Sequence, residues 1–127
     1  MNENELSKII IGACIEVHKE LGPGLLESVY EHCLAYELRG KGLDVKKQHP
    51  LPVIYKGEQM DMGFRLDIWV NQLVIVEVKA VDFLNDIHLA QVLTYLKLTN
   101  CKLGMLINFN ELKVTNGIKR VVNQLTL

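Results

Sequence analysis

Apolar residues recur along the chain with two different periods, and the change of period separates helices from strands. A spacing of three to four residues, typical of one helix face, holds over Leu6–Leu21 and Leu26–Leu38. Gly22-Pro23-Gly24 should end the first helix, and Gly40 and Gly42 the second. The pattern predicts helices over residues 4–21, 25–39 and 86–99, and strands over 44–56, 64–70, 73–80, 103–109 and 118–122.

The predicted order ααβββαβ(β) describes an α/β (α+β) fold in which helices flank a mixed β-sheet. The helix over residues 86–99 joins two strands, so we expect a right-handed crossover that lies over one sheet face. Pro50 and Pro52 lie in the first strand. Because proline cannot donate to a β-ladder, we expect this strand at an edge or with a bulge, and a turn at Lys56-Gly57-Glu58.

Three charges interrupt the two central strands. Alternation predicts one face formed by Phe64, Leu66, Ile68 and Val70, and the opposite face by Arg65, Asp67 and Trp69. Placing the apolar sets on one side pairs Val70 with Val74, Ile68 with Val76 and Leu66 with Val78. Asn71-Gln72-Leu73 then forms the loop, and Asp67 lies across from Glu77. We therefore expect two carboxylates about 5 Å apart at the Cβ level, beside Lys79.

Two facing carboxylates repel, and two kinds of compensation are open. A divalent cation, Mg²⁺ or Mn²⁺, would accept their hard oxygen ligands. Alternatively Lys79, or Arg65 across from it, supplies the positive charge, and the residues form a salt-bridge ladder on a solvated sheet face. Spacing alone does not separate a metal site from such a ladder.

Composition excludes several classes of protein. The 127 residues are 49% hydrophobic and 23% charged, which predicts one globular domain over residues 1–127. The net charge of −1 argues against a protein that binds polyanions by bulk charge alone. No apolar stretch approaches the ~18 residues of a membrane span, and the start lacks a secretory pattern. Cys14, Cys33 and Cys101 show no metal-ligand or disulfide spacing. We interpret them as buried structural thiols in a cytoplasmic protein.

Three further residues have an ordinary interpretation as well as a functional one. Glu27 lies in the first turn of the second helix, where a carboxylate interacts well with the helix dipole. Gln91 and Tyr95 share one stripe of the third helix with His88. A polar stripe of this kind is typical of a helix margin, so spacing alone assigns these residues no role.

The combination of these elements resembles a known family. Asp67 followed by Glu77-Val78-Lys79 is similar to the PD-(D/E)XK nuclease core. Gly24-Leu25-Leu26-Glu27-Ser28-Val29-Tyr30 resembles the signature of the GxxExxY family within that superfamily, as do Gln91–Leu96 and Gly104–Phe109. The resemblance spans about residues 5–123 and implies a restriction-endonuclease-like core. One departure is the superfamily's leading proline, because Met62-Gly63-Phe64-Arg65-Leu66 precedes Asp67.

The resemblance implies a role for each matching position. Asp67, Glu77 and the backbone carbonyl of Val78 would ligate Mg²⁺ (or Mn²⁺), and Glu27 would bind it directly or through water. Lys79 would orient or activate the attacking water. Gln91 and Tyr95 would support the site or the substrate, while Arg65, Lys46 and Lys47 could hold flanking phosphates.

We therefore expect a Mg²⁺-dependent nuclease that hydrolyses phosphodiester bonds of DNA or a structured nucleic acid. A second hypothesis is a catalytically silent module of this fold that binds nucleic acid or a protein partner. A third is a dimeric structural domain whose charged face is only solvated. Because so small a domain offers little recognition surface, a homodimer or a protein partner is an expected addition.

Overall fold

The computed structural model describes residues 1–125. All helices and strands predicted above are present, in the order ααβββαβ(β) with one short 3₁₀ turn added. Their bounds are α1 (Glu3–Leu21), α2 (Glu27–Gly40), β1 (Val45–Tyr55), β2 (Glu58–Val70), β3 (Val74–Lys79), α3 (Asp86–Thr99), β4 (Leu103–Asn108), η1 (Val114–Gly117) and β5 (Ile118–Val122). The largest difference is β2, which begins at Glu58 rather than Phe64. None of the helices in residues 1–125 is long and apolar enough to cross a membrane.

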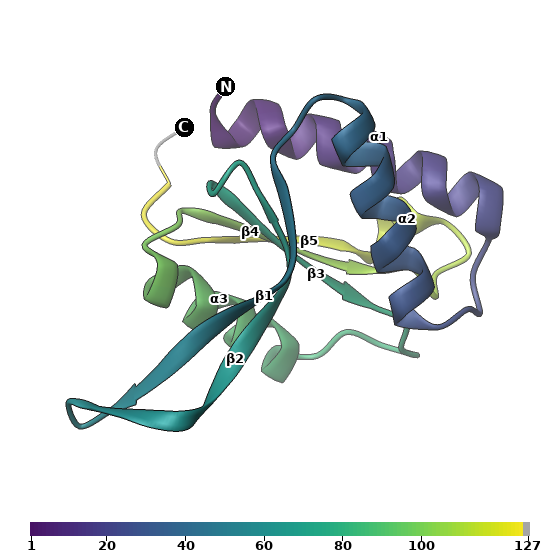
Figure 1. Cartoon of the computed structure of the whole chain (residues 1–127). Helices are drawn as coiled ribbons and strands as arrows, with labels where there is room; N and C mark the ends of the chain where they lie inside the picture. Colours follow the sequence, from purple (N-terminus) through teal and green to yellow (C-terminus); the bar gives the residue numbers. More distant parts are fainter. Residues whose placement is uncertain (126–127) are drawn as a thin grey trace.

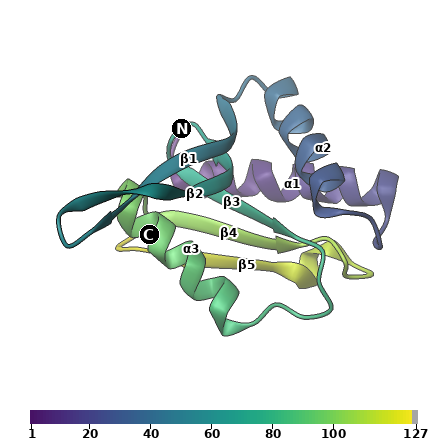
Figure 2. The ribbon, with the colours of Figure 1, turned by 60° about the horizontal axis from the view of Figure 1, so that its bottom comes forward.

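The five strands form one mixed sheet in the order β1-β2-β3-β4-β5. Only β3 and β4 run parallel, and α3 connects them; the other neighbours are antiparallel. Helices α1 and α2 lie on one face of the sheet and α3 lies on the other (Figures 1 and 2). The mixed sheet flanked by helices is therefore confirmed, and β1 is an edge strand as its prolines indicated.

Each sheet face has its own apolar core. The core beneath α1 and α2 takes alternate residues of β3, Val74, Val76 and Val78, while Ile75 points to the α3 core. In β2, Leu66 lies in the α3 core, whereas Ile68 and Val70 lie in the α1–α2 core. The sequence pattern had placed all three residues on one face. The expectation that Phe64 and Leu66 continue the Ile68 face is therefore wrong.

The face changes because β2 leaves its regular pairing near Asp67. The ladder between β2 and β3 contains Ile68 opposite Val76 and Val70 opposite Val74, as predicted, and it does not continue to Leu66. On the other side of β2, the ladder with β1 lacks a pair between Gln48 and Asp67. Gln48 has a φ of 49°. A left-handed residue inside a strand bends it and increases its twist.

Strands β1 and β2 extend beyond the sheet as a two-stranded arm (Figures 1 and 2). Their register shifts between Pro52 and Ile54, which confirms an irregular strand at the prolines. The turn at Lys56 and Gly57 has φ values of 52° and 83°.

Nearer the sheet, β2 carries Trp69, whose indole Nε1 is buried without a hydrogen-bond partner within residues 1–125.

Candidate active site

Asp67 and Glu77 are held against each other by the backbone of the opposite strand. The amide of Asp67 donates to Oε2 of Glu77 at 2.8 Å, and the amide of Val78 donates to Oδ2 of Asp67 at 2.9 Å. These two bonds lie where the β2–β3 backbone ladder ends. The carboxylates therefore connect the two strands just where they separate, and the predicted juxtaposition of Asp67 and Glu77 is present.

Burial makes this carboxylate pair difficult to ionise. Glu77 is 3% exposed, and loss of solvent together with the negative charge of Asp67 raises its pKa to about 8. Burial also raises the pKa of Asp67, while the Val78 amide and the charge of Lys79 oppose that shift. Two such acids near one another are characteristic of sites that bind a cation or transfer a proton.

Lys79 ends β3 two residues beyond Glu77, on the same side of the strand by alternation. Its half-buried ammonium acts on both carboxylates, because its charge lowers the pKa of Asp67 and of Glu77. Arg65, which we placed across from Lys79, is exposed and donates instead to the backbone oxygen of Gln48 at 3.4 Å. The contacts of the carboxylates are thus mainly with backbone amides and do not form the Arg65 salt-bridge ladder.

Helix α2 adds two more acids. The carboxylate of Glu27 is exposed and accepts from the amide of Ala80 at 3.4 Å. Glu31, one turn further along, is only 8% exposed, and sequence reasoning missed it. Gln48 Nε2 donates to Oε1 of Glu31 at 2.5 Å and to Oδ1 of Asp67 at 3.4 Å, so one amide connects α2 with β2. The spacing of four residues from Glu27 was the available signal, because such residues share a helix face.

The connection between α1 and α2 is fixed by Tyr30. Its buried hydroxyl donates to the oxygen of Gly22 at 2.6 Å and accepts from the amide of Leu25 at 3.1 Å. Its ring stacks on Phe109 with centroids 4.6 Å apart. Gly24 has a φ of 93° in the same connection, a conformation that favours glycine. Together these features set the start of α2 and hence the position of its first acid.

The two adjacent lysines do not act as a pair. Lys46 lies over the ring of Trp69, with its Nζ 5.8 Å from the centroid. Lys47 turns towards α2, where its Nζ is 3.3 Å from Nδ1 of His32 and its charge lowers the pKa of Glu31. Neighbouring residues of a strand point to opposite faces, so Lys46 and Lys47 cannot grip the same phosphate.

Helix α3 carries both Gln91 and Tyr95, and the two side chains differ in burial. Tyr95 is 4% exposed and meets Phe64 edge to face, with centroids 5.5 Å apart. Burial and then the charges of Glu77 and Asp67 raise the pKa of its hydroxyl. Gln91 is exposed and makes no side-chain hydrogen bond within the described part of the chain.

Comparison with family models gives one match. A family model described as the PD-(D/E)XK nuclease superfamily matches residues 4–121. The chain belongs to the PD-(D/E)XK nuclease superfamily. No curated protein and no solved structure gives a match. Nuclease-superfamily membership thus rests on the family model, and the contacts above describe how this member arranges its acids.

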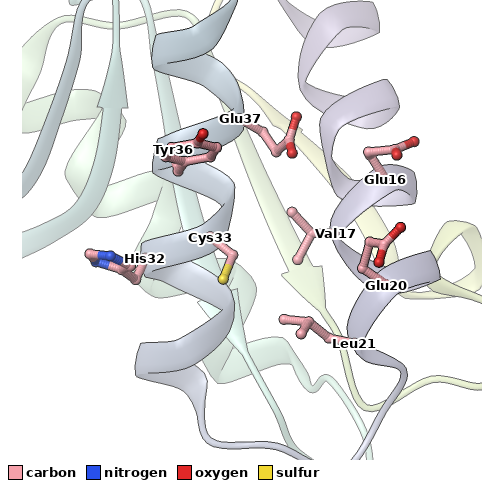
Figure 3. Close-up of a pocket in the computed structure, with 8 residues that line it drawn as sticks. All are labelled: Glu16, Val17, Glu20, Leu21, His32, Cys33, Tyr36 and Glu37. Carbon is pink, nitrogen blue, oxygen red and sulfur yellow. The ribbon is translucent and has the colours of Figure 1, made fainter.

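Glu27, Glu31 and Asp67 of this PD-(D/E)XK domain line a cavity of about 220 Å³ together with Ser28, Gln48 and Val78, whereas Glu77 is not among its lining residues. A second cavity of about 200 Å³ lies between α1 and α2 (Figure 3). Its floor is apolar, with Val17 and Leu21, and Glu16 and Glu20 stand exposed at its rim. Because Glu31 is buried and Asp67 half-buried, whereas Glu16 and Glu20 are exposed and keep their hydration, the first cavity is the better place for cation chemistry.

The donor set of the first cavity fits a hard divalent cation. Members of the superfamily typically use such ions, and carboxylate oxygens are their preferred ligands. Within residues 1–125 no group of three or more His, Cys, Asp or Glu side chains is arranged to hold a metal ion by itself. A cation bound by Asp67 and Glu77 would therefore complete its coordination with a backbone carbonyl or water rather than with a third side chain of these types.

Proposed function

We propose that this chain is a nuclease that hydrolyses phosphodiester bonds of DNA or a structured nucleic acid with the help of Mg²⁺ or Mn²⁺. The observation that carries the proposal is the pair of half-buried Asp67 and buried Glu77, joined across two separating strands, with Lys79 two residues beyond Glu77. Membership of the nuclease superfamily supports the same reaction class.

In this proposal, Asp67, Glu77 and the backbone carbonyl of Val78 would hold the cation, with Glu27 acting directly or through water. A bound divalent ion polarises a phosphoryl oxygen and lowers the pKa of coordinated water. Glu31 and Gln48 position the carboxylate of Asp67, because Gln48 contacts both acids.

Lys79 would hold the attacking water and offset the negative charge that develops on the phosphate. An ammonium suits both roles, since it donates three hydrogen bonds and does not compete for the cation. Tyr95 would support the site from the α3 side, since the charges of Glu77 and Asp67 act on its hydroxyl and raise its pKa. Arg65 donates only to the backbone oxygen of Gln48, Lys46 lies over Trp69, and Gln91 is exposed, so we assign these three residues no part in the chemical step.

We further propose that the chain belongs to the GxxExxY family. Each of the three signature residues has a structural role, since Gly24 adopts a φ of 93°, Glu27 contacts the amide after β3, and Tyr30 ties the α1–α2 connection. A glycine, an acid and a tyrosine at this spacing therefore form one device that presents a carboxylate to the end of β3.

Incubation of the purified chain with labelled DNA and RNA substrates tests the nuclease proposal. We expect cleavage that requires Mg²⁺ or Mn²⁺, stops with EDTA, and falls at least about 100-fold in Glu77→Gln and in Lys79→Met. Glu58→Gln, at an exposed carboxylate of the arm, is the matched control. Cleavage that survives both site substitutions would refute the proposal.

A silent nucleic-acid-binding module is the second candidate function. The absence of a three-ligand cluster within residues 1–125 favours it over catalysis. Salt-dependent binding of a DNA probe that is unchanged in the Glu77→Ala, Lys79→Ala double variant, with no cleavage by the parent chain, would select this function.

A further inference from the structure

One face of helix α1 is exposed along almost the whole length of the helix. The opposite face packs into the core on the sheet, α2 contacts one flank, and the η1 region contacts the other. Helix α1 therefore lies at the outside of the fold (Figure 1). At about 3.6 residues per turn, six of its exposed residues fall within an arc of about 100°. We call them the outer face of α1: Glu5, Lys8, Gly12, Ile15, Glu16 and Lys19.

Gly12 lies at the centre of the outer face and in the middle of the helix. Glycine is among the weakest helix formers, so its use in a helix interior calls for a physical reason. The backbone of Gly12 is ordinary right-handed helix, and an added Cβ would meet nothing within 4 Å. Neither the conformation nor the packing of residues 1–125 therefore requires a glycine here. The missing side chain does provide a low point on the surface, at which a second helix can approach closely.

The charges of the outer face change sign about Gly12. Glu5 lies seven residues before it and Lys19 seven residues after it, while Lys8 lies four before and Glu16 four after. A two-fold axis through Gly12 reverses the direction of the helix and exchanges these positions. A second copy of α1 laid antiparallel on the first would place its Lys19 opposite Glu5 and its Glu16 opposite Lys8. Symmetry repeats both contacts, so the two helices would be joined by pairs of opposite charge only.

Other arrangements of two α1 helices bring like charges together. Parallel pairing in register would set Glu5 against Glu5 and Lys8 against Lys8. Sliding the antiparallel copy by three residues would oppose Glu5 to Glu16 in one direction and Lys8 to Lys19 in the other. Because like charges in contact repel, the pattern selects one direction and one register.

Apolar side chains border the Lys8–Glu16 contact. Ile15 is 43% exposed, and it lines a groove of about 260 Å³ together with Leu112, which is 90% exposed. In the antiparallel arrangement Lys8 of the second copy arrives next to Ile15, and its aliphatic stem can cover this side chain. Contact with a second copy would therefore remove apolar surface from water as well as pair charges.

We propose that the outer face of α1 is a self-association surface, on which a second copy of this chain packs antiparallel about a two-fold axis through Gly12. One helix per copy is a small contact compared with about 800 Å² per partner in a stable complex, so we expect a weak dimer that salt weakens further. The proposal is independent of the nuclease function, because α2, β1, β2 and β3 supply the lining of the cavity that holds Glu27, Glu31 and Asp67.

Disulfide trapping tests the position of the axis. All variants carry Cys33→Ser, because Cys14 and Cys101 are buried and Cys33 is the half-buried thiol. Gly12→Cys places a thiol on the axis, where it faces its own copy, whereas Glu5→Cys places the two thiols about 20 Å apart on the same exposed face. After oxidation and non-reducing electrophoresis, we expect at least about fivefold more covalent dimer for Gly12→Cys than for Glu5→Cys.

Charge exchange tests the pairing. Sedimentation velocity up to about 1 mM chain, at low and at high salt, measures the association. Lys8→Glu and Glu16→Lys should each weaken it at least about tenfold, because each substitution creates two like-charge contacts. The double variant Lys8→Glu, Glu16→Lys restores opposite charges and should return to within about threefold of the parent. Lys102→Glu, at an exposed lysine outside α1, changes the net charge equally and is the matched control.

Four results would each overturn the proposal. The first is a parent chain that sediments as a monomer at every concentration, and the second is equal trapping of Gly12→Cys and Glu5→Cys. The third is a dimer that Lys8→Glu leaves intact, since the contact would then lie on another surface. The fourth is a double variant that keeps the parent's circular dichroism spectrum but associates as weakly as the single variants.

Discussion

Replacing Glu77 by glutamine should remove a pH-dependent loss of stability. The pKa of Glu77 is about 8 in the folded chain and 4.5, its ordinary value, in the unfolded chain. Between pH 4.5 and 8, Glu77 therefore keeps a proton in the folded state and loses it on unfolding. The folded state therefore binds more protons, and the free energy of unfolding must fall as pH rises from 4.5 to 8. At about 1.4 kcal/mol per pH unit, the fall amounts to roughly 3–5 kcal/mol.

Glutamine keeps an oxygen that can accept the Asp67 amide but has no charge to desolvate. Urea unfolding followed by circular dichroism in EDTA, at steps from pH 5 to pH 8, measures the difference. We expect Glu77→Gln to match the parent near pH 5 and to exceed it at pH 8 by roughly 2–4 kcal/mol. The exposed-site variant Glu58→Gln should follow the parent throughout. Parallel curves for the parent and Glu77→Gln would refute this reasoning.

Three further substitutions test other contacts. Tyr30→Phe keeps the ring stacking but loses the bond to Gly22, so the melting temperature should fall by an amount equivalent to about 1–2 kcal/mol; an unchanged melting temperature would contradict it. Gly104→Ala should lower the free energy of unfolding in urea by about 1–3 kcal/mol, because the added Cβ would lie 2.5 Å from a side chain of α3. The control Gly12→Ala, in α1 with open space around it, should leave this free energy unchanged or raise it by up to ~1 kcal/mol. Equal effects of the two substitutions would count against the packing argument. Asn108→Leu should lower the free energy of unfolding by about 2–4 kcal/mol, because the two hydrogen bonds from the Asn108 side chain to the β3–α3 loop are lost. The same substitution should increase proteolysis of that loop. A proteolysis pattern like that of the parent chain would contradict the role of Asn108 as an anchor.

Periodicity was sufficient for most of the fold and for the centre of the site. Alternation in two short strands predicts the pairs Ile68–Val76 and Val70–Val74, and both are observed. That register alone brings Asp67 beside Glu77. The inference succeeds because one face of each strand is buried, and a slip of one residue would expose it.

The same alternation gave the wrong core for Leu66, on the other side of Asp67 from Ile68. Leu66 joins the α3 core because β1 contains a left-handed residue at Gln48, and a polar residue with positive φ inside a strand gives little sequence signal. The contact of Glu31 with Asp67 through Gln48 depends on how α2 is placed on the sheet, which local patterns do not contain. Strand alternation by itself separates Lys46 from Lys47, and the two side chains do have different neighbours.

Trp69 gives this protein a built-in optical reporter. It is the only tryptophan in the chain, it lies two residues from Asp67 on β2, and its indole nitrogen is buried without a partner among residues 1–125. Indole emission is sensitive to polarity, so a shift of β2 that lets water reach Nε1 should move the fluorescence to longer wavelength. Titrations with cations or oligonucleotides can therefore be followed on the unlabelled chain, with the signal coming from the strand that carries the acid.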